Sequence, residues 1–385
     1  MDQRRDDLAR WAADAIRRYT SSNANNNIAA SPEGDASPLE NAVESAADSS
    51  SAQMEFTVTM VSGDASFRRY FRLQHKDFSW IAVDAPADKE DNPRFVAIAK
   101  AWRDHEVAVP RVIDYDFERG FMLLEDFGDR LLWPALHRDD ITLSEVSDYY
   151  RQAIRQLLHI QTMPVKNLPV YDAELLDREM ALFPDWLCQQ QLGMELSGAE
   201  QDMLQSVFTT LRERALAQRQ VVVHRDFHSR NLMLRDDGSL GVIDFQDAVA
   251  GPATYDLISL LRDSYVRWPQ ALVDELAAEY WEAARPLGVY LDSWEEFQRD
   301  FDWVSMQRHL KVAGIFARLN LRDGKPGYLA DIPNTCQYLQ EICSRYDEFE
   351  AFSQWLEKRF MPALASLNAL IPPAGTEALR DSSAE

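Results

Sequence analysis

Three polar residues in one short stretch have the types and the spacing that phosphoryl transfer requires. The stretch covers residues 221–247 and reads VVVHRDFHSRNLMLRDDGSLGVIDFQD. Asp226 follows a run of valines, Asn231 comes five residues later, and Asp244 ends the next apolar run. A carboxylate on a loop can accept the proton of an acceptor hydroxyl, and aspartate and asparagine offer the hard oxygen ligands that suit Mg²⁺. One loop and one strand end would therefore supply a base and a metal site.

The combination is more specific than its parts. A lone His-Arg-Asp is common, and an aspartate at a strand end is often only a cap or turn residue. Here the triplet is followed by Asn231, by a predicted turn at 236–238, and by an apolar strand that ends in Asp-Phe. We therefore interpret Asp226 as the catalytic base and Asn231 and Asp244 as the ligands of Mg²⁺.

This stretch resembles the protein-kinase-like fold, and within it the aminoglycoside and choline phosphotransferase branch. Its metal loop at 244–246 reads Asp-Phe-Gln, not Asp-Phe-Gly, and GPATYDL at 251–257 is similar to the G-x-P-x-x-D-L segment of that branch. The A-P-E segment of protein kinases is not visible. The resemblance implies a two-lobed α+β fold, with an antiparallel-sheet small lobe, a mainly helical large lobe, and Mg²⁺ and ATP between them. It also implies that His228 lies near the transferring phosphate.

A closer resemblance covers about residues 55–370. It is carried by GDASFRRYFR at 63–72, DAP at 84–86, LLEDFGDR at 123–130, VHRDFHSRNLM, IDFQDAVAGPATYDL, and LKVAGIFARL at 310–319. Together these segments look like those of the bacterial anomeric amino-sugar kinases. Such enzymes phosphorylate N-acetylmuramate and N-acetylglucosamine at the C1 hydroxyl in the recycling of cell-wall peptidoglycan, and the resemblance implies the same reaction here.

Two other functions stay open. Nothing in the catalytic residues distinguishes a sugar C1 hydroxyl from the hydroxyl of an aminoglycoside or of choline, so a phosphotransferase for such an acceptor is one alternative. The second is a nucleotide-binding pseudokinase that regulates a partner through residues 20–53. The retained base and both metal ligands argue against a pseudokinase, whereas the absence of a lysine from the third predicted strand keeps it open.

The small lobe is expected to span 1–127 and to bind the nucleotide. Residues 56–61, 67–73 and 80–84 have the composition of three antiparallel strands. In a kinase-like fold the first hairpin lies over the nucleotide phosphates, and the hinge at 125–128 faces the adenine. The expected nucleotide-binding residues are therefore Ser62, Gly63, Asp64, Ala65, Ser66, Arg69, Glu125 and Phe127.

The third strand departs from the kinase pattern. Kinases present a lysine to the α and β phosphates there, but IAVDAP carries Asp84 at that point. The helix expected at 92–104 contains no glutamate in its interior, so the usual lysine–glutamate ion pair is absent or replaced. Spacing alone leaves several sources for the missing positive charge: Arg68, Arg69, Arg72 and Lys89.

The large lobe, 128–372, is expected to be helical apart from the catalytic hairpin and to bind the acceptor. Asp256 is interpreted as a helix cap rather than a substrate contact. In a helix expected at 293–322, Arg308, Lys311, Arg318 and Arg322 share one face. That basic stripe either binds an anion, such as the lactyl carboxylate of N-acetylmuramate, or is a solvated face, and the two interpretations have equal weight. The candidate substrate-binding residues are Arg230, Arg308, Lys311 and Arg318.

Composition sets further limits. A net charge of −23 over 385 residues argues against a nucleic-acid partner, and no apolar stretch is long enough to span a membrane. Three cysteines without disulfide or zinc spacing favour a cytoplasmic protein. Residues 2–19 are expected to form an amphipathic helix, 20–53 a disordered insertion, and 373–385 a flexible tail. The oligomeric state does not follow from the sequence.

Overall fold

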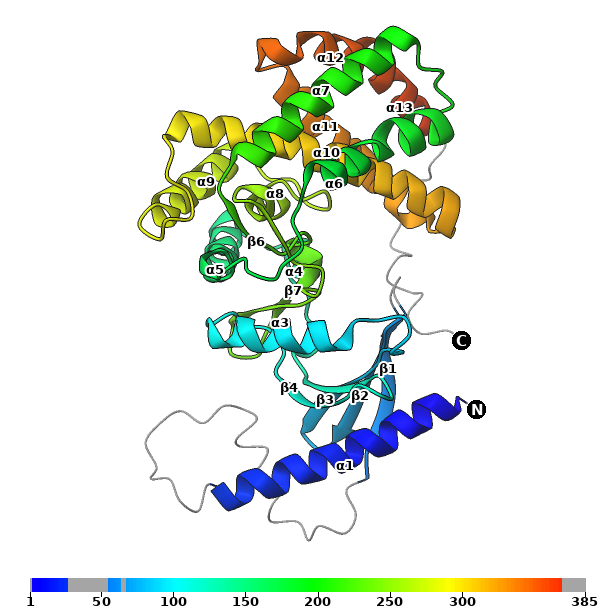
Figure 1. Cartoon of the computed structure of the whole chain (residues 1–385), viewed down its shortest axis with the longest axis vertical. Helices are drawn as coiled ribbons and strands as arrows, with labels where there is room; N and C mark the ends of the chain where they lie inside the picture. Colours follow the sequence, from blue (N-terminus) through cyan, green and yellow to red (C-terminus); the bar gives the residue numbers. More distant parts are fainter. Residues whose placement is uncertain (1, 27–54, 64–66, 369–385) are drawn as a thin grey trace. The chain divides into compact units, whose positions relative to one another are not determined.

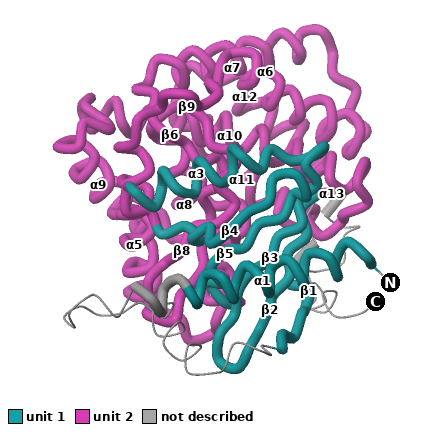
Figure 2. The backbone as a smooth tube through the Cα atoms, turned by 60° about the horizontal axis from the view of Figure 1, so that its bottom comes forward, with its two compact units in different colours: residues 1–104, 108–128 teal, residues 105–107, 129–385 magenta. Residues whose placement is uncertain are grey.

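The computed structural model describes residues 2–26, 55–63 and 67–368. The predicted insertion lies outside the described residues from residue 27 to residue 53, and the predicted tail lies wholly outside them. The chain forms two compact units, which Figure 2 shows in different colours. Unit 1 comprises residues 1–104 and 108–128, and unit 2 comprises residues 105–107 and 129–385.

Unit 1 is built on one five-stranded sheet in the order β1-β2-β3-β5-β4. Every neighbouring pair of strands is antiparallel, as the sequence predicts. The strands are β1 (Thr57–Gly63), β2 (Arg69–His75), β3 (Phe78–Asp84), β4 (Val112–Asp116) and β5 (Phe121–Glu125).

Two helices, α1 (Gln3–Asn26) and α3 (Asn92–Asp104), lie on opposite faces of this sheet (Figure 1). The face under α1 is apolar, because alternate residues of β2, β3 and β5 pack against the apolar stripe of the helix. That stripe and its partners are Leu8, Trp11, Ala12, Ala15, Ile16, Phe71, Leu73, Trp80, Ala82, Phe121 and Leu123. Helix α1 runs further than the predicted 2–19, and the Thr20 hydroxyl donates back to the Ile16 carbonyl over 3.0 Å.

Unit 2 is mainly helical and carries two short antiparallel pairs, β6 with β9 and β7 with β8. The strands are β6 (Gln220–Val223), β7 (Leu232–Leu234), β8 (Leu240–Val242) and β9 (Val249–Pro252). The α-helices are α4 (Leu132–Leu136), α5 (Leu143–Thr162), α6 (Ala173–Met180), α7 (Gly198–Ala217), α8 (Tyr255–Leu261), α9 (Gln270–Ala284), α10 (Trp294–Asp323), α11 (Ile332–Cys343), α12 (Glu350–Trp355) and α13 (Met361–Asn368). Shorter segments are the π-helices η2 (Phe183–Gln191) and η6 (Leu356–Phe360) and the 3₁₀-helices η3 (Ser229–Asn231), η4 (Pro326–Asp331) and η5 (Asp347–Phe349).

Helix α10 is the central element of unit 2. Every residue from Asp300 to Gly314 is buried, so neighbouring elements cover this part of the helix on all sides. At Gly314 a side chain would not fit, because a Cβ atom would lie 2.3 Å from the backbone carbon of Leu182. The charged residues between Asp300 and Gly314, among them Arg308 and Lys311, are therefore enclosed by protein, whereas a solvated helix face would expose them.

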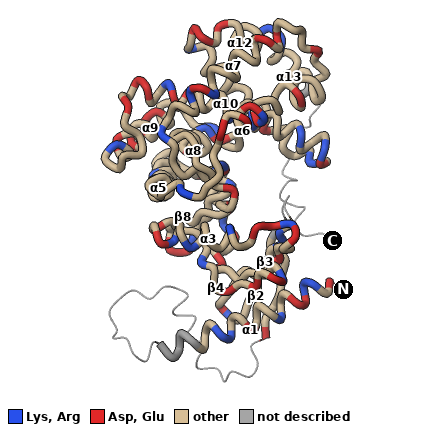
Figure 3. The backbone as a smooth tube through the Cα atoms, viewed as in Figure 1, with Lys and Arg blue, Asp and Glu red and all other residues tan. Residues whose placement is uncertain are grey.

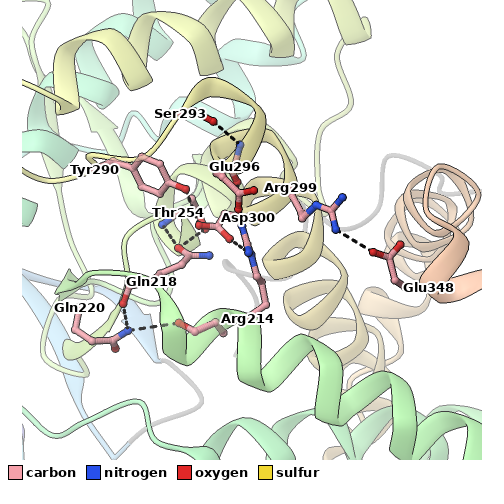
Figure 4. A network of polar contacts seen from close by, with 11 residues as sticks. Arg214, Gln218, Gln220, Thr254, Tyr290, Ser293, Glu296, Arg299, Asp300 and Glu348 are labelled. Carbon is pink, nitrogen blue, oxygen red and sulfur yellow. Dashed lines mark hydrogen bonds and ion pairs between the residues drawn. The ribbon is translucent and has the colours of Figure 1, made fainter.

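A polar network fixes the start of α10 (Figure 4). Ser293 caps the helix by accepting a hydrogen bond from the Glu296 N–H. Arg214 of α7 donates to Asp300 and Glu296, and the Tyr290 hydroxyl donates to Asp300 over 2.6 Å. Burial raises the pKa of Asp300, and its hydrogen bonds and the Arg214 charge oppose that rise. These contacts hold α7 against the first turns of α10.

Charge is distributed over both units. Figure 3 shows basic and acidic residues interspersed along the backbone, so the excess of negative charge is not confined to one segment. Within the part of the chain that the structure describes, no helix is both long enough and apolar enough to cross a membrane.

Candidate active site

The loop that follows β6 positions the expected base, Asp226. Its backbone is held by Asp256 of α8, whose carboxylate accepts the His224 N–H over 2.6 Å and the Arg225 N–H over 3.0 Å. Arg225 has a φ of 79°, a left-handed conformation that is unusual for a side chain of this size and is held by these bonds. The interpretation of Asp256 as a helix cap is wrong, because its carboxylate supports the catalytic loop instead. Burial raises the pKa of Asp256 to about 6.

His224 connects the loop that carries Asp226 to the segment that ends in Asp244. Its Nδ1 accepts the Asp226 N–H over 3.3 Å, and its Nε2 lies 2.9 Å from the Ile243 carbonyl oxygen. A carbonyl oxygen can only accept, so the proton of the ring belongs on Nε2. Because Ile243 N–H donates to the Asn231 carbonyl over 3.1 Å, one buried imidazole ties together the segments that carry all three expected catalytic residues.

The two expected metal ligands lie beside each other. Asn231 donates from Nδ2 to the Asp226 carbonyl over 3.0 Å and to the Asp244 carboxylate over 3.3 Å. Asp244 is exposed, has a φ of 65°, and accepts from Gln246 over 2.7 Å. Carboxylate and amide oxygens at this spacing fit Mg²⁺, which keeps several water and phosphate ligands of its own. In the described ranges, no group of three or more His, Cys, Asp or Glu side chains could hold a metal ion.

A buried carboxylate, Glu179 of α6, organises the cations around the base. It accepts from Arg225 over 2.6 Å and from the hydroxyl of Tyr171, and Lys311 of α10 lies 3.4 Å away. Burial opposes ionisation of Asp226, but the charge of Lys311, and more weakly that of Arg225, lowers the pKa of Asp226 below its usual range. The carboxylate of Asp226 is therefore charged and ready to accept a proton at neutral pH.

His228, expected near the transferring phosphate, lies two residues beyond the base. Its N–H donates to the Asp226 carbonyl over 3.1 Å, and its ring meets that of Tyr265 edge-on at 5.3 Å. The turn is held by Asp263, which accepts from the Ser229 N–H over 3.1 Å and the Ser229 hydroxyl over 2.5 Å. Burial lowers the pKa of His228, so the imidazole is neutral at pH 7. The sequence missed Asp263 because it lies 34 residues away from the turn it supports.

Arg230, a candidate substrate-binding residue, is held between two aromatic rings. Its guanidinium carbon lies 3.7 Å from the centre of the Tyr265 ring and 4.7 Å from that of Trp133. Asp331 belongs to the same neighbourhood, since burial raises its pKa to about 6 and the Arg230 charge opposes the rise. Arg230 is therefore a cation packed between two aromatic rings, four residues after the expected base.

The four residues of the basic stripe on α10 differ in how deeply they are buried. Lys311 is buried and donates to the Tyr255 hydroxyl over 3.0 Å. Arg308 is buried, Arg318 is half-buried, and Arg322 is exposed and pairs with its neighbour Asp323 over 2.7 Å. The interpretation as a solvated face is therefore wrong for Arg308 and Lys311.

The expected nucleotide-binding residues all belong to unit 1. Gly63 ends β1 opposite Arg69, and Ser62 precedes it next to a β-bulge. The hairpin residues Asp64, Ala65 and Ser66 lie outside the described residues.

The hinge residues follow β5. Glu125 accepts from Arg103 over 3.2 Å and from the Arg111 N–H over 3.1 Å, and its own N–H donates to the Arg111 carbonyl over 2.9 Å. Any contact between Glu125 and an adenine would therefore come from its carbonyl oxygen. Phe127 is buried at the end of the same segment.

Arg69 is an expected nucleotide-binding residue and one of the four candidate sources of the missing positive charge, and its side chain pairs with acidic residues. Arg69 donates to Asp84 over 2.6 Å and also to Asp2, and Asp84 accepts from Arg4 of α1 over 2.6 Å. Asp84 and Arg69 therefore lie on the α1 face of the sheet, and strand alternation places Arg68 and Arg72 on the other face.

An arginine–glutamate pair stands on that second face. Arg68 lies 2.8 Å from Glu90, just before α3, and 5.6 Å from the ring centre of Phe95 on α3. Both charged side chains are largely buried. This arginine–glutamate ion pair stands where the sequence predicted the usual lysine–glutamate pair to be absent or replaced, and the sequence could not show it because Glu90 precedes the helix.

Comparison with known proteins agrees with this geometry. A model of the phosphotransferase enzyme family matches residues 57–297. The N-acetylmuramate/N-acetylglucosamine kinase of Pseudomonas putida is 42% identical over 76% of this chain and 85% of its own length. The protein of the same name from Neisseria meningitidis serogroup B is 41% identical over 77% of this chain and 88% of its own length.

Solved structures show the same fold at low sequence identity. Choline kinase LicA from Streptococcus pneumoniae has a TM-score of 0.52 and 12% identity, with 79% of this chain and 100% of that chain covered. An ADP-bound aminoglycoside phosphotransferase has a TM-score of 0.50 and 16% identity, with 80% of this chain and 99% of that chain covered. The protein-kinase-like fold predicted from the catalytic motif is thereby confirmed.

Proposed function

The chain belongs to the phosphotransferase enzyme family, and from this we propose that it is an ATP-dependent kinase that phosphorylates the C1 hydroxyl of N-acetylmuramate and N-acetylglucosamine. The observation that carries the proposal is an ionised aspartate, Asp226, fixed beside two hard oxygen ligands, Asn231 and Asp244. The choice of sugar rests on two relatives of more than 40% identity whose names state those acceptors.

Each part of the site has a chemical role in this reaction. Asp226 orients the acceptor hydroxyl and takes its proton, and Asn231 and Asp244 would hold Mg²⁺, which supplies charge neutralisation on the phosphates. His228 is neutral, so it can donate a hydrogen bond toward the transferring group without repelling Lys311. We assign nucleotide binding to residues 1–127 and catalysis and acceptor binding to residues 128–372. A cytoplasmic role in peptidoglycan recycling follows from the same likeness.

Phosphorus NMR of the reaction product tests the function and its regiochemistry together. The purified protein is incubated with Mg²⁺ and ATP and with N-acetylmuramate, N-acetylglucosamine, kanamycin or choline. We expect an anomeric sugar-phosphate signal with both amino sugars and none when Mg²⁺ is chelated. Phosphorylation of kanamycin or choline alone would keep the family and overturn the acceptor. Nucleotide binding without any transfer would point to a pseudokinase.

A further inference from the structure

One buried cation of unit 2, Arg308 of α10, has no partner. Its side chain is 3% exposed, and its Nε and Nη1 atoms are buried without a hydrogen-bond acceptor. No residue that the structure describes forms a hydrogen bond or an ion pair with it. Other buried cations nearby are compensated: Arg262 lies 2.6 Å from Asp302, and Lys311 contacts Glu179 and Tyr255. An uncompensated buried charge costs several kcal/mol, so its presence calls for an anion from elsewhere.

The surroundings of Arg308 place it beside the catalytic turn. The next residue, His309, lies 3.0 Å through Nε2 from the Arg262 carbonyl, and Phe316 of α10 packs on the ring of Tyr265 at 5.8 Å. These contacts hold α10 against the segment 262–265, and that segment in turn holds the turn at His228 through Asp263 and Tyr265.

The charges of the base are already balanced without Arg308. Asp226 and Glu179 are carboxylates, and Lys311 and Arg225 are the cations that face them. Asp263, the other buried carboxylate of the turn, accepts hydrogen bonds from Ser229 and from the Tyr265 N–H and none from Arg308, so the donors of Arg308 are left for a ligand. The two proposed acceptors differ in one respect that matters here: N-acetylmuramate carries an ether-linked lactyl group that ends in a carboxylate, and N-acetylglucosamine carries a hydroxyl there. A guanidinium binds a carboxylate through two parallel hydrogen bonds, from Nη2 together with either Nε or Nη1, and in Arg308 both Nε and Nη1 lack a partner.

We propose that Arg308 binds the carboxylate of N-acetylmuramate and thereby distinguishes this acceptor from N-acetylglucosamine. The proposal rests on the proposed function and assigns to one residue the recognition of a group that only one acceptor has. Arg308 acts on binding of the acceptor, whereas Asp226 and the metal ligands serve both sugars equally.

The test is the ratio of kcat/KM for the two sugars, measured at saturating Mg²⁺-ATP for the wild type and for Arg308→Met, Arg308→Lys and Arg322→Gln. A hydrogen-bonded charge pair contributes enough that we expect Arg308→Met to lower kcat/KM for N-acetylmuramate about 10- to 100-fold. With N-acetylglucosamine the change should stay within about threefold. Arg308→Lys keeps the charge but not the paired donors, so its kcat/KM for N-acetylmuramate should lie between those of the wild type and Arg308→Met. Arg322→Gln removes an exposed arginine of the same helix and should change neither sugar.

Thermal unfolding separates a ligand role from a structural one. Removing an unpaired buried charge should leave the midpoint temperature of Arg308→Met unchanged or higher. Equal loss of activity with both sugars, or no loss with either, would overturn the proposal. If Arg308→Met does not fold, the sugar ratio of Arg308→Lys decides. A wild type that phosphorylates neither sugar would overturn the proposed function, and this inference with it, whereas a wild type active on both with an unchanged ratio in the variants would overturn this inference alone.

Discussion

Each unit contains a buried aspartate whose carboxylate accepts hydrogen bonds from two partners, and the two aspartates have different structural roles. Asp84, at the end of β3 in unit 1, is 1% exposed at its side chain and is bound by the guanidinium groups of Arg4 and Arg69. Asp256, at the start of α8 in unit 2, is 0% exposed and is bound by two backbone N–H groups of the catalytic loop. The first fixes a helix to a sheet through charge, and the second fixes a backbone conformation that catalysis uses.

The difference shows where the kinase pattern is retained and where it is replaced. In unit 2 the carboxylate of Asp256 supports Arg225 and through it the base, so the motif and its support are both present. In unit 1 the position expected for lysine carries an acid that faces α1, and the opposite face carries the Arg68–Glu90 pair instead. Changes in unit 2 should therefore affect turnover, and changes around Asp84 should affect the stability of unit 1.

The largest effect is expected at the base. Asp226→Asn keeps the size of the side chain but removes its capacity to accept a proton. We expect kcat to fall about 10²- to 10⁴-fold with either amino sugar, while the dissociation constant for ATP changes little. Steady-state kinetics and calorimetric titration with ATP measure the two quantities. A variant that retains near-normal turnover would show that Asp226 is not the base.

Asp84→Lys tests whether the missing lysine can be restored. Because this position faces α1, the new ammonium would meet Arg4 and Arg69 instead of phosphates. We expect the variant to lose about 3 kcal/mol of free energy of unfolding and to gain no affinity for ATP. Asp88→Lys, at a side chain that is 73% exposed, is the matched control and should stay within about 0.5 kcal/mol of the wild type. A lower KM for ATP in Asp84→Lys would mean that this strand end faces the nucleotide.

Local pattern predicted most of the elements of this fold, because apolar spacing and strand composition act over a few residues. The helix α3 has the predicted bounds 92–104, and β3 ends at the predicted residue. The pattern could not show the π-helix η2 (Phe183–Gln191), because its buried residues Phe183, Leu187 and Cys188 have a spacing that an α-helix would also place in the interior. In that region the sequence predicted one continuous helix at 174–191.

The site was predictable where its residues are close in sequence. Asp226, Asn231 and Asp244 come from one hairpin, so their meeting follows from the turn between them. The supports of the catalytic segment come from distant elements: Asp256 is 32 residues from His224, and Asp263 is 34 residues from Ser229. Pairings of this kind depend on the tertiary fold, and no spacing rule anticipates them.

Buried His309 of α10 is expected to make the free energy of unfolding depend on pH. The ring is buried, packs at a tilt of 31° on the ring of Tyr338 and contacts the Arg262 carbonyl. Burial lowers its pKa to about 3 from the usual 6.5, so between these values the unfolded chain takes up a proton that the folded chain refuses. The contribution of this residue to the free energy of unfolding should thus fall by about 1.4 kcal/mol for each pH unit below 6.5.

Urea unfolding at pH 6.5 and pH 5 measures this contribution. The wild type should lose about 2 kcal/mol more over that interval than His309→Gln, which cannot take up the proton. Tyr338→Leu is the matched control, since it removes the ring packed against His309, lowers stability at both pH values, and retains the imidazole and its pH dependence. Equal losses in the wild type and His309→Gln would show that the imidazole is not held neutral by the fold.

The smallest effect is expected at Arg4, which holds the beginning of α1 to the sheet. Its side chain is 40% exposed, so solvent weakens its attraction to Asp84, and Arg69 still compensates the buried carboxylate when Arg4 is removed. We expect Arg4→Gln to lower the free energy of unfolding of unit 1 by about 1 kcal/mol. Arg10→Gln on the same helix, at a side chain that is 74% exposed, should change it by less than about 0.5 kcal/mol. Hydrogen exchange of the amides of β3 reports the difference without unfolding unit 2. If the β3 amides are equally protected from exchange in Arg4→Gln and Arg10→Gln, α1 is held to the sheet by its apolar stripe alone. The charge of Asp84 then serves only to keep Arg69 on that face of the sheet.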